Sequence, residues 1–358
     1  MKLYQIVETV ERNNDAGTKA VQDTVIIAEN VGFKPIYIKK NNTKKTLISR
    51  VTRQLNYSAE WSAAYRIIEP NSIVMLQNPF RSRQFLREWV LRKLKKKKNV
   101  KFVSLIHDVE ELRQFLFSNY YKHEFEFMLE QSDVFIVHNE NMADFFRKRG
   151  IPEEKLVILE IFDYLQEVKN FCIPQFEKKI IVAGNLDAKK CGYIGELSQL
   201  KNVEIQLYGP NFDNKMKAYG NIHYGGSLLP DKVSEKLTSG FGLVWDGTSI
   251  DGCKGDAGQY LRYNNPHKLS LYLSSGLPVI IWSGAAEADF VKKNGVGIVV
   301  DSLFELPDNM MKITEEKYTD MQKNAEKLAE KLTKGYFMET SLKKALKKLE
   351  INEVGKHN

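Results

Sequence analysis

Residues 265–268, Asn-Pro-His-Lys, place two cation-capable side chains at the start of an expected short helix. Asn265 is suited to cap this helix, and Pro266 suits its first turn. A cation at a helix N-terminus opposes the helix dipole unless an anion lies there. Lys268 and the helix N-terminus together therefore predict an anion-binding site. A solvated lysine stays an alternative for Lys268, and a packed or exposed histidine stays one for His267.

Three loops that carry glycine follow expected strands in the second half of the chain. They are Gly184-Asn185, Tyr208-Gly209-Pro210-Asn211 and Asp246-Gly247. The carboxyl ends of parallel strands meet at one edge of a sheet, so three such loops favour a ligand site there, although any such sheet carries glycine in its loops. The polar stretch 251–258, DGCKGDAG, is expected to be a mobile loop over that site.

The expected anion is a diphosphate, which needs a second cation. Lys189 and Lys190 follow the sequence AGN after three intervening residues and are expected on a loop that faces the cleft. Arg262 is the other candidate, and a solvated loop is an equal alternative for the lysine pair. The chain has no HxxxH, HExxH or DxD pair near an apolar strand end. We therefore expect Lys, Arg and helix dipoles to neutralise the diphosphate, with no metal and no cofactor.

Candidates for a general base follow the strands of the first half. His107 and Asp108 end the strand VKFVSLIHD, which places the pair at the cleft. Adjacent residues of an extended chain point to opposite sides, so one of the two can be structural, and we favour Asp108. Asp15, in the first loop NNDAGTKA, is a competing base. His138 ends the next strand, and we expect a structural or acceptor-contact role for it.

Strands and helices alternate along the whole chain, which predicts parallel sheets with helices on both faces. The length of 358 residues suggests two domains, and the sequence FCIPQFEKK interrupts the rhythm near 165–177. The expected fold is α/β, with two doubly wound Rossmann-like domains that face a shared cleft. Long helices are expected at 46–68, 81–97, 314–332 and 336–349.

The formal net charge is +8, and one stripe accounts for it. Residues 81–101 contain ten Lys and Arg residues and one Glu, so the rest of the chain sums to about −1. The stripe is either a solvated helix face or a basic amphipathic helix for a membrane surface, anchored by Phe85, Leu86, Trp89 and Leu91. Nucleic acid is a third alternative, but no base-reading motif supports it.

The location is predicted from the cysteines and the apolar stretches. Three cysteines without a CxxC spacing indicate reduced thiols in the cytoplasm. The sequence shows neither a signal peptide nor a window of about 18 apolar residues. We expect a cytoplasmic protein, peripheral at the inner face of the membrane if the stripe 81–101 binds lipid.

Several stretches resemble a bacterial sugar-transferase family of the GT-B fold. They are GFGLVWDG, GQYLRYNNPHKLSLYLSSGLPVIIW and AAEADFVKKNGVGIVVDSLFEL, with NDAGTKA, IHDVEELR and SDVFIVHNENM in the first half. Members are described as β-1,6-galactofuranosyltransferases, and related members glucosylate modified serine-rich adhesins. The resemblance covers roughly residues 1–345.

The resemblance implies a role for each part of the chain. Residues 1–170 would bind the acceptor, 171–335 the UDP-sugar donor, and 336–358 would form a helix that crosses back to the first domain. Lys268 with Lys189 or Lys190 would hold the diphosphate without a metal, and Tyr208 to Asn211 would lie near the uracil. The donor pocket would be lined by Asp246, Tyr263 and Asn265. Many GT-B enzymes carry a ribose-binding glutamate where this chain has Leu271, so Ser270 or the backbone would hold the ribose.

The reaction expected is hexosyl transfer, with galactofuranosyl favoured, from a UDP-sugar to a saccharide in cell-surface polysaccharide or glycoconjugate synthesis. A glucosyltransferase for a glycosylated adhesin and a non-catalytic sugar-binding partner of another transferase are the alternatives, and a UDP-sugar epimerase is a further one. The basic stripe favours a lipid-linked acceptor. By analogy with the family we also expect a homo-oligomer.

Overall fold

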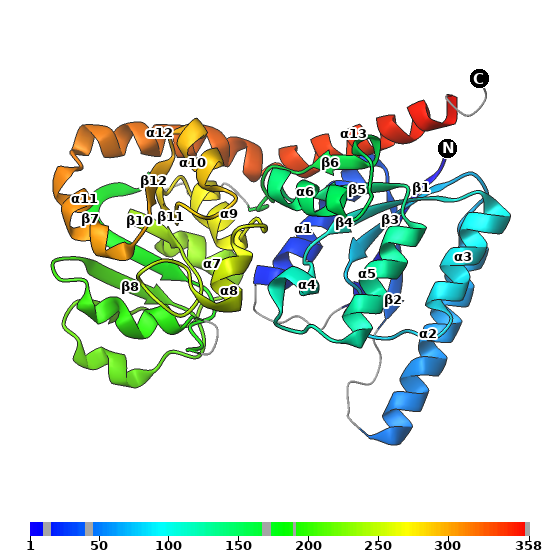
Figure 1. Cartoon of the computed structure of the whole chain (residues 1–358), viewed down its shortest axis with the longest axis horizontal. Coiled ribbons are helices and arrows are strands. Elements are labelled where there is room, and N and C mark those ends of the chain that lie inside the picture. The colour runs from blue at the N-terminus through cyan, green and yellow to red at the C-terminus, as the bar shows by residue number, and fades with distance from the viewer. Residues whose placement is uncertain (10–15, 40–45, 167–172, 189–190, 355–358) are drawn as a thin grey trace.

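The computed structural model describes residues 1–9, 16–39, 46–166, 173–188 and 191–354. Within these ranges the chain forms two six-stranded parallel sheets, each flanked by helices (Figure 1). The expected α/β architecture is confirmed. Asp15, Lys189 and Lys190 lie outside the described residues, as does Cys172. The thiols of Cys191 and Cys253 are buried.

The first sheet has the order β2-β1-β3-β4-β5-β6 and the second β12-β11-β10-β7-β8-β9. The strands of the first sheet are β1 (Leu3–Thr9), β2 (Lys34–Lys39), β3 (Ile73–Asn78), β4 (Lys101–Ile106), β5 (Val134–Val137) and β6 (Leu156–Ile158). Those of the second are β7 (Gln175–Ala183), β8 (Glu204–Tyr208), β9 (Ile222–Tyr224), β10 (Ser239–Val244), β11 (Val279–Trp282) and β12 (Gly297–Val300). Strand order reverses between β1 and β3 and between β7 and β10, and ligands bind at such switch points.

Helices connect the strands and cover both sheets. Those of the first half are α1 (Ala16–Val31), α2 (Leu47–Ile67), α3 (Arg87–Lys98), α4 (Glu110–Arg113), α5 (Asn119–Gln131) and α6 (Glu140–Lys148). Those of the second half are α7 (Pro230–Val233), α8 (Gly255–Tyr260), α9 (His267–Ser274), α10 (Ala288–Asn294), α11 (Leu306–Lys312), α12 (Glu315–Leu332) and α13 (Tyr336–Val354). Short 3₁₀ helices lie at Glu153–Lys155, Gly192–Gln199, Asn214–Ala218, Ser234–Lys236 and Leu303–Glu305.

The central strands are buried on both faces, which explains their continuous apolar sequences. All residues of β5, β10 and β11 are buried, and β3 is exposed only partly, at Gln77. Such runs are typical of parallel strands covered by helices on either side. No described helix is both long and apolar enough to pass through a membrane.

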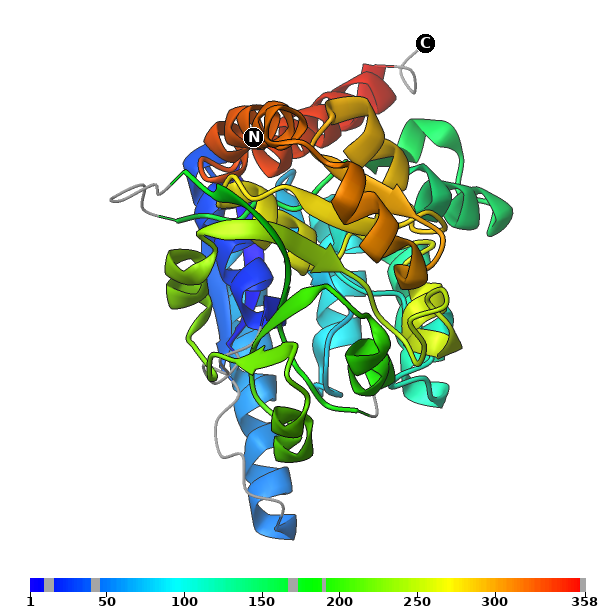
Figure 2. The same cartoon turned by 90° about the vertical axis from the view of Figure 1, so that its left-hand side faces the viewer.

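Helix α13 joins the two halves of the molecule. It packs against α1, β5 and β6 of the first sheet, although it follows the last strand of the second (Figure 1). Asp163 accepts hydrogen bonds from the backbone N–H groups of Phe337 and Met338 at the start of α13. Figures 1 and 2 both show the N-terminal half of α2 projecting beyond the body of the first domain.

Three local expectations are wrong. The basic helix begins at Arg87 instead of 81, because Leu86 at its N-cap has a positive φ of 66°. Helix α8 takes up part of the expected loop 251–258. Asn265 does not cap α9: Pro266 is the N-cap residue, and the Asn265 side chain bonds to the first domain instead.

Candidate active site

The second sheet places the three predicted loops together at its switch point. Gly184 follows β7, Gly209 follows β8, and Asp246 lies two residues after β10. Gly209 has a φ of 146°, and a Cβ atom there would lie 1.7 Å from the carbonyl oxygen of Gly184. Only glycine permits this approach, so the loops after β7 and β8 lie against each other.

Lys268, in the first turn of α9, points toward the end of β10. Its Nζ donates to the carbonyl oxygen of Trp245 at 2.6 Å and lies 3.2 Å from Oδ1 of Asp246. Burial alone lowers the pKa of Lys268, but the Asp246 carboxylate outweighs burial and holds the pKa above 10.5. The ammonium is therefore charged at neutral pH. Two of its three N–H groups suffice for these two contacts, so the third can donate to a ligand.

Asparagine side chains fix the neighbouring loops. Oδ1 of Asn185 accepts from Nδ2 of Asn211 at 2.8 Å and from the backbone N–H of Asp187 at 3.0 Å. Tyr208 is half-buried at the end of β8, with its ring over Gly225. The loops after β7 and β8 thus form one polar surface beside the Lys268–Asp246 pair.

Tyr263 and Asn265 bond to the first domain. Asn265 is buried between the domains, where Nδ2 donates to the carbonyl oxygens of His138 and Glu160 and Oδ1 accepts from Asn139. The carbonyl oxygen of Tyr263 accepts from Asn139 as well. Ser270 is buried within α9, and its Oγ has no hydrogen-bond partner among the described residues. These contacts make Asn265 a link between the domains.

Three histidines surround Phe162 at this link. The ring of His107 stacks on Phe162 at 5.5 Å, and the rings of His138 and His267 lie 5.0 and 4.9 Å from it. His138 accepts from the backbone N–H of Asn265 through Nδ1 and contacts the Ile106 carbonyl through Nε2, so it carries its proton on Nε2. Burial lowers the pKa of His138 to about 4 and that of His267 to about 3. All of this indicates structural, neutral rings for His138 and His267.

Asp108 lies where the first domain contacts the second, at Tyr260. Its Oδ2 accepts from Nη1 of Arg113 at 2.8 Å, and its Oδ1 accepts from the hydroxyl of Tyr260 at 3.4 Å. The same hydroxyl accepts from the backbone N–H of Val109. His107 contacts Gln77 through Nε2 at 2.7 Å, and burial lowers its pKa well below 6.5. Asp108 is therefore the stronger candidate for a base near neutral pH.

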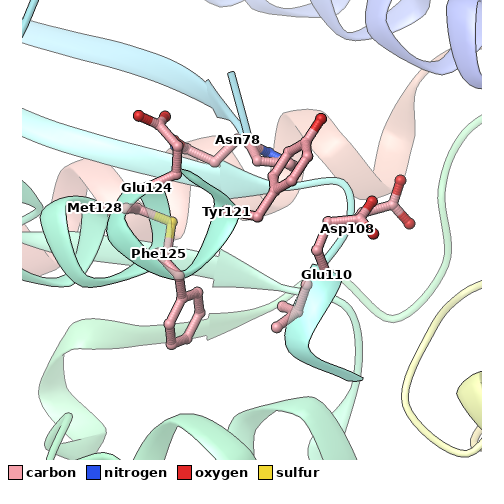
Figure 3. Close-up of a pocket in the computed structure, with 9 residues that line it drawn as sticks. Asn78, Asp108, Glu110, Tyr121, Glu124, Phe125 and Met128 are labelled. Carbon is pink, nitrogen blue, oxygen red and sulfur yellow. The ribbon is translucent and has the colours of Figure 1, made fainter. Parts of the chain in front are cut away.

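A small hollow adjoins Asp108 at the ends of β3 and β4 (Figure 3). Its lining comes from the strand ends and from α5: Asn78, Pro79, Asp108, Val109, Glu110, Tyr121, Glu124, Phe125 and Met128. Its cavity volume is about 10 Å³, which is room for one water molecule. The hollow is therefore too small to hold a sugar ring.

Arg262 contacts residues other than the Lys268–Asp246 pair. Its guanidinium lies over the ring of Trp282 at 4.6 Å, and Nε donates to Gln259. Among the described residues, no group of three or more His, Cys, Asp and Glu side chains is arranged to hold a metal ion.

Sequence reasoning missed two partners of Asp108. Arg113 follows in HDVEELR with helical spacing to Glu110, which was a usable signal. Tyr260 comes from another domain, 152 positions along the chain, and no local pattern connects it to Asp108.

Comparison with known proteins identifies the family of the chain. Residues 3–161 match the family described as glucosyltransferase 3-like, N-terminal domain, and residues 180–345 match the C-terminal domain of that family. The β-1,6-galactofuranosyltransferase WbbI of Escherichia coli (strain K12) is 34% identical over 69% of this chain and 71% of its own. The chain belongs to this family of glycosyltransferases.

A second relative matches a larger part of this chain. Glucosyltransferase 3 of Streptococcus gordonii is 29% identical over 89% of this chain and 90% of its own. Among solved structures, the lipopolysaccharide outer core galactosyltransferase WaaB has a TM-score of 0.62 at 13% identity, covering 97% of this chain and 99% of that chain. Anabaena HepE in complex with UDP has a TM-score of 0.59 at 12% identity, covering 97% and 100%. The fold is GT-B, and the enzyme is a glycosyltransferase.

Proposed function

We propose that this glycosyltransferase transfers a hexosyl group, with galactofuranosyl favoured, from a UDP-sugar to a saccharide acceptor of cell-surface polysaccharide or glycoconjugate synthesis. The observation that carries the proposal is the charged Lys268 ammonium at the start of α9, beside three loops at the switch point of the second sheet. A helix N-terminus and a lysine together are suited to a diphosphate. No metal is needed in this proposal.

The donor binds across the second domain. Lys268 and the N-terminus of α9 stabilise the negative charge that the leaving UDP gains as its glycosidic bond breaks. The loop Tyr208 to Asn211 and the Gly184-Asn185 turn face the nucleoside, and Asp246 keeps Lys268 oriented and charged. Lys189 or Lys190 supplies the second cation. Ser270 is proposed only as a ribose contact, Tyr263 and Asn265 only as lining of the donor pocket.

An inverting transfer needs one base on the acceptor hydroxyl, and we place this base in the first domain. Asp108 takes the proton of the acceptor hydroxyl, while Tyr260 and Arg113 hold the carboxylate in place. His107 is the weaker alternative because burial keeps its pKa well below 6.5. Asp15 stays a third candidate.

The preference for a galactofuranosyl donor is supported by the relatives. The identity to the galactofuranosyltransferase, 34%, exceeds that to the S. gordonii glucosyltransferase, 29%, although the second match is longer. Transfer of glucose to a glycosylated adhesin is therefore the second candidate. A non-catalytic partner of another transferase is the third, and it would release no UDP from any donor.

Incubation with UDP-galactofuranose, UDP-galactose and UDP-glucose, each with EDTA and a mixture of saccharides, tests the proposal. We expect UDP release from UDP-galactofuranose in the presence of EDTA. Faster release from UDP-glucose would replace the sugar assignment, and no release from any of the three would contradict transferase activity. Release without any acceptor product would favour an acceptor-independent reaction.

Membrane contact through residues 81–101 forms part of the proposal, with a lipid-linked acceptor at the inner face of the membrane. Phe85 and Trp89 are 65% and 50% exposed, whereas Leu91 is buried in the core and cannot anchor the protein. Lys96 and Lys97 are exposed on the same helix as Trp89.

A vesicle assay tests this membrane contact. We expect the triple variant Trp89→Ala, Lys96→Glu, Lys97→Glu to abolish sedimentation with vesicles rich in phosphatidylglycerol. The control variant Lys343→Glu should leave the sedimentation unchanged. Equal sedimentation of both variants would contradict the membrane contact.

Self-association is proposed on the analogy with the family alone. Sedimentation equilibrium tests it directly. A mass above that of the 41.3 kDa chain would support a homo-oligomer, and a monomer at micromolar concentration would contradict it.

A further inference from the structure

A groove in the first domain lies next to the Asp108 hollow and is much larger. It has a volume of about 510 Å³, within the range of roughly 300–1,000 Å³ that is usual for ligand sites. We call it the distal groove. It lies between α2, the segment 83–88 and α5, and it is lined by Gln54, Arg83, Gln84, Phe85, Arg87, Glu88, Tyr120, His123 and Glu124.

The wall of the distal groove is held rigidly without any ligand. Gln54 donates to the carbonyl oxygen of Arg83 at 3.0 Å and accepts from the backbone N–H of Phe85 at 2.8 Å. Gln84 accepts from Trp61 at 2.7 Å and donates to Glu8 at 2.6 Å. Since these bonds already fix the segment, binding costs little ordering entropy.

The floor of the groove is supported by a buried guanidinium. Arg87 is 2% exposed, and its Nη2 pairs with Glu124. The same guanidinium lies over the ring of Phe80 at 4.6 Å. Its Nε and Nη1 are shielded from solvent, so Arg87 holds the floor in place and presents no exposed donor to a ligand.

The lining is suited to a sugar rather than to an anion. Phe85 is 65% exposed, so its ring offers an aromatic surface for the C–H face of a hexose. The guanidinium of Arg83 lies over the ring of Tyr120 at 5.6 Å and covers that face of the ring. Glu88, which contacts His123 at 2.9 Å, offers a partner for hydroxyl groups. Glu88 and Glu124 balance the charges of Arg83 and Arg87, so the lining carries no excess positive charge that would attract a phosphate or a uronate.

The distal groove continues toward the candidate base. Glu124 lines both the groove and the Asp108 hollow. Tyr120 belongs to the groove and Tyr121 to the hollow, with ring centroids 5.1 Å apart. Figure 3 shows Tyr121 between Glu124 and Asp108. An acceptor whose terminal sugar reaches Asp108 therefore has its preceding sugars beside the distal groove.

We infer that the distal groove binds the saccharide acceptor beyond its reacting sugar, so that the enzyme prefers an oligosaccharide to a monosaccharide. This inference rests on the proposed function, because it presumes a saccharide acceptor and Asp108 as the base. In this inference Arg83, Phe85 and Tyr120 determine which acceptor length the enzyme prefers. None of the three touches the donor surface described above.

The test compares methyl hexosides with the corresponding linear di- and trisaccharides. For the wild type we expect a KM at least ten-fold lower for the trisaccharides than for the monosaccharides. The double variant Arg83→Ala, Phe85→Ala is expected to remove this difference, with no change in UDP affinity or in turnover of the monosaccharide. Both side chains are exposed, so the variant retains its fold. Phe304→Ala, 53% exposed in the second domain, is the matched control.

Saturation-transfer NMR of the same trisaccharides measures binding independently of turnover. Loss of the signal in the double variant but not in the control would support the groove. An equal signal in both, or a wild type without preference for length, would overturn it. Failure of the wild type to bind UDP would instead overturn the proposed function. A double variant that loses only binding to phosphatidylglycerol vesicles would assign this face to the membrane and contradict the groove.

Discussion

Lys268 combines a fixed positive charge with partial access to solvent. Its side chain is 16% exposed, and Asp246, 11% exposed, holds it at the end of β10. A carboxylate beside the lysine keeps the ammonium in place before an anion arrives. Charge-assisted bonds of this kind contribute roughly 1.5–3 kcal/mol each.

Lys268→Ala is expected to reduce kcat/KM for the UDP-sugar by about 10- to 100-fold, since it removes one charge-assisted bond to the diphosphate. The measurement is steady-state UDP release, with circular dichroism to verify the fold. Lys343→Ala removes an exposed lysine that pairs with Glu339 and should leave the rate unchanged. An unchanged rate in Lys268→Ala would exclude Lys268 from diphosphate binding.

Asp108→Asn is expected to reduce kcat by about 10²–10⁴-fold, because an amide cannot accept the proton of the acceptor hydroxyl. UDP affinity should stay the same, since Asp108 lies in the first domain. The control is Glu111→Gln, which removes a carboxylate from helix α4, shortly after Asp108 in the chain. If both variants lose the same activity, Asp108 acts through the structure and is not the base.

At the scale of elements, the link between α9 and the first domain depends on buried polar groups. The backbone and side chain of Asn265 bond to His138, Glu160 and Asn139. His138 can accept from Asn265 only while its ring is neutral. The position of α9, and therefore of Lys268, is coupled to the protonation of His138.

The pKa of His138, lowered to about 4, predicts a loss of stability in acid. The unfolded chain binds a proton near pH 6.5 and the folded chain does not, so stability is complete above pH 6.5 and falls as the pH decreases toward 4. Between pH 7.5 and 5 we expect this residue to cost about 2 kcal/mol.

Urea denaturation of the wild type and of His138→Gln at both pH values measures this cost. The variant should be less stable at pH 7.5 and lose about 2 kcal/mol less than the wild type on acidification. An equal loss in both proteins would show that His138 titrates normally in the folded state.

At the scale of the molecule, the sequence predicted the strands and the points where they end. Runs such as 73–76 and 279–282 are apolar throughout because helices cover both faces of each sheet. The loops at Gly184, Gly209 and Asp246 follow from where those runs stop. The link between the domains could not be predicted from the sequence, because Asn265 and Asn139 lie 126 positions apart. The start of α3 could not be predicted either, because it depends on the positive φ of Leu86.

The roles of the basic residues in 81–101 could not be predicted from the sequence either. Composition alone assigned ten cations to one surface stripe, but several of them serve the fold. Arg87 is buried against Glu124, Lys95 bonds to Asp133, and Lys98 donates to the carbonyl oxygens of Tyr65 and Ile68. Long side chains can bury their stems and reach such partners, which no residue count reveals.

Isothermal titration calorimetry with UDP, ADP and GDP, each with and without EDTA, measures most directly whether the second domain binds a nucleotide diphosphate through Lys268. We expect micromolar affinity for UDP that EDTA does not change, weaker binding of ADP and GDP, and at least ten-fold weaker UDP binding by Lys268→Ala. Equal affinity of Lys268→Ala, or the absence of UDP binding by the wild type, would contradict the Lys268 site. Binding abolished by EDTA would contradict its independence of metal.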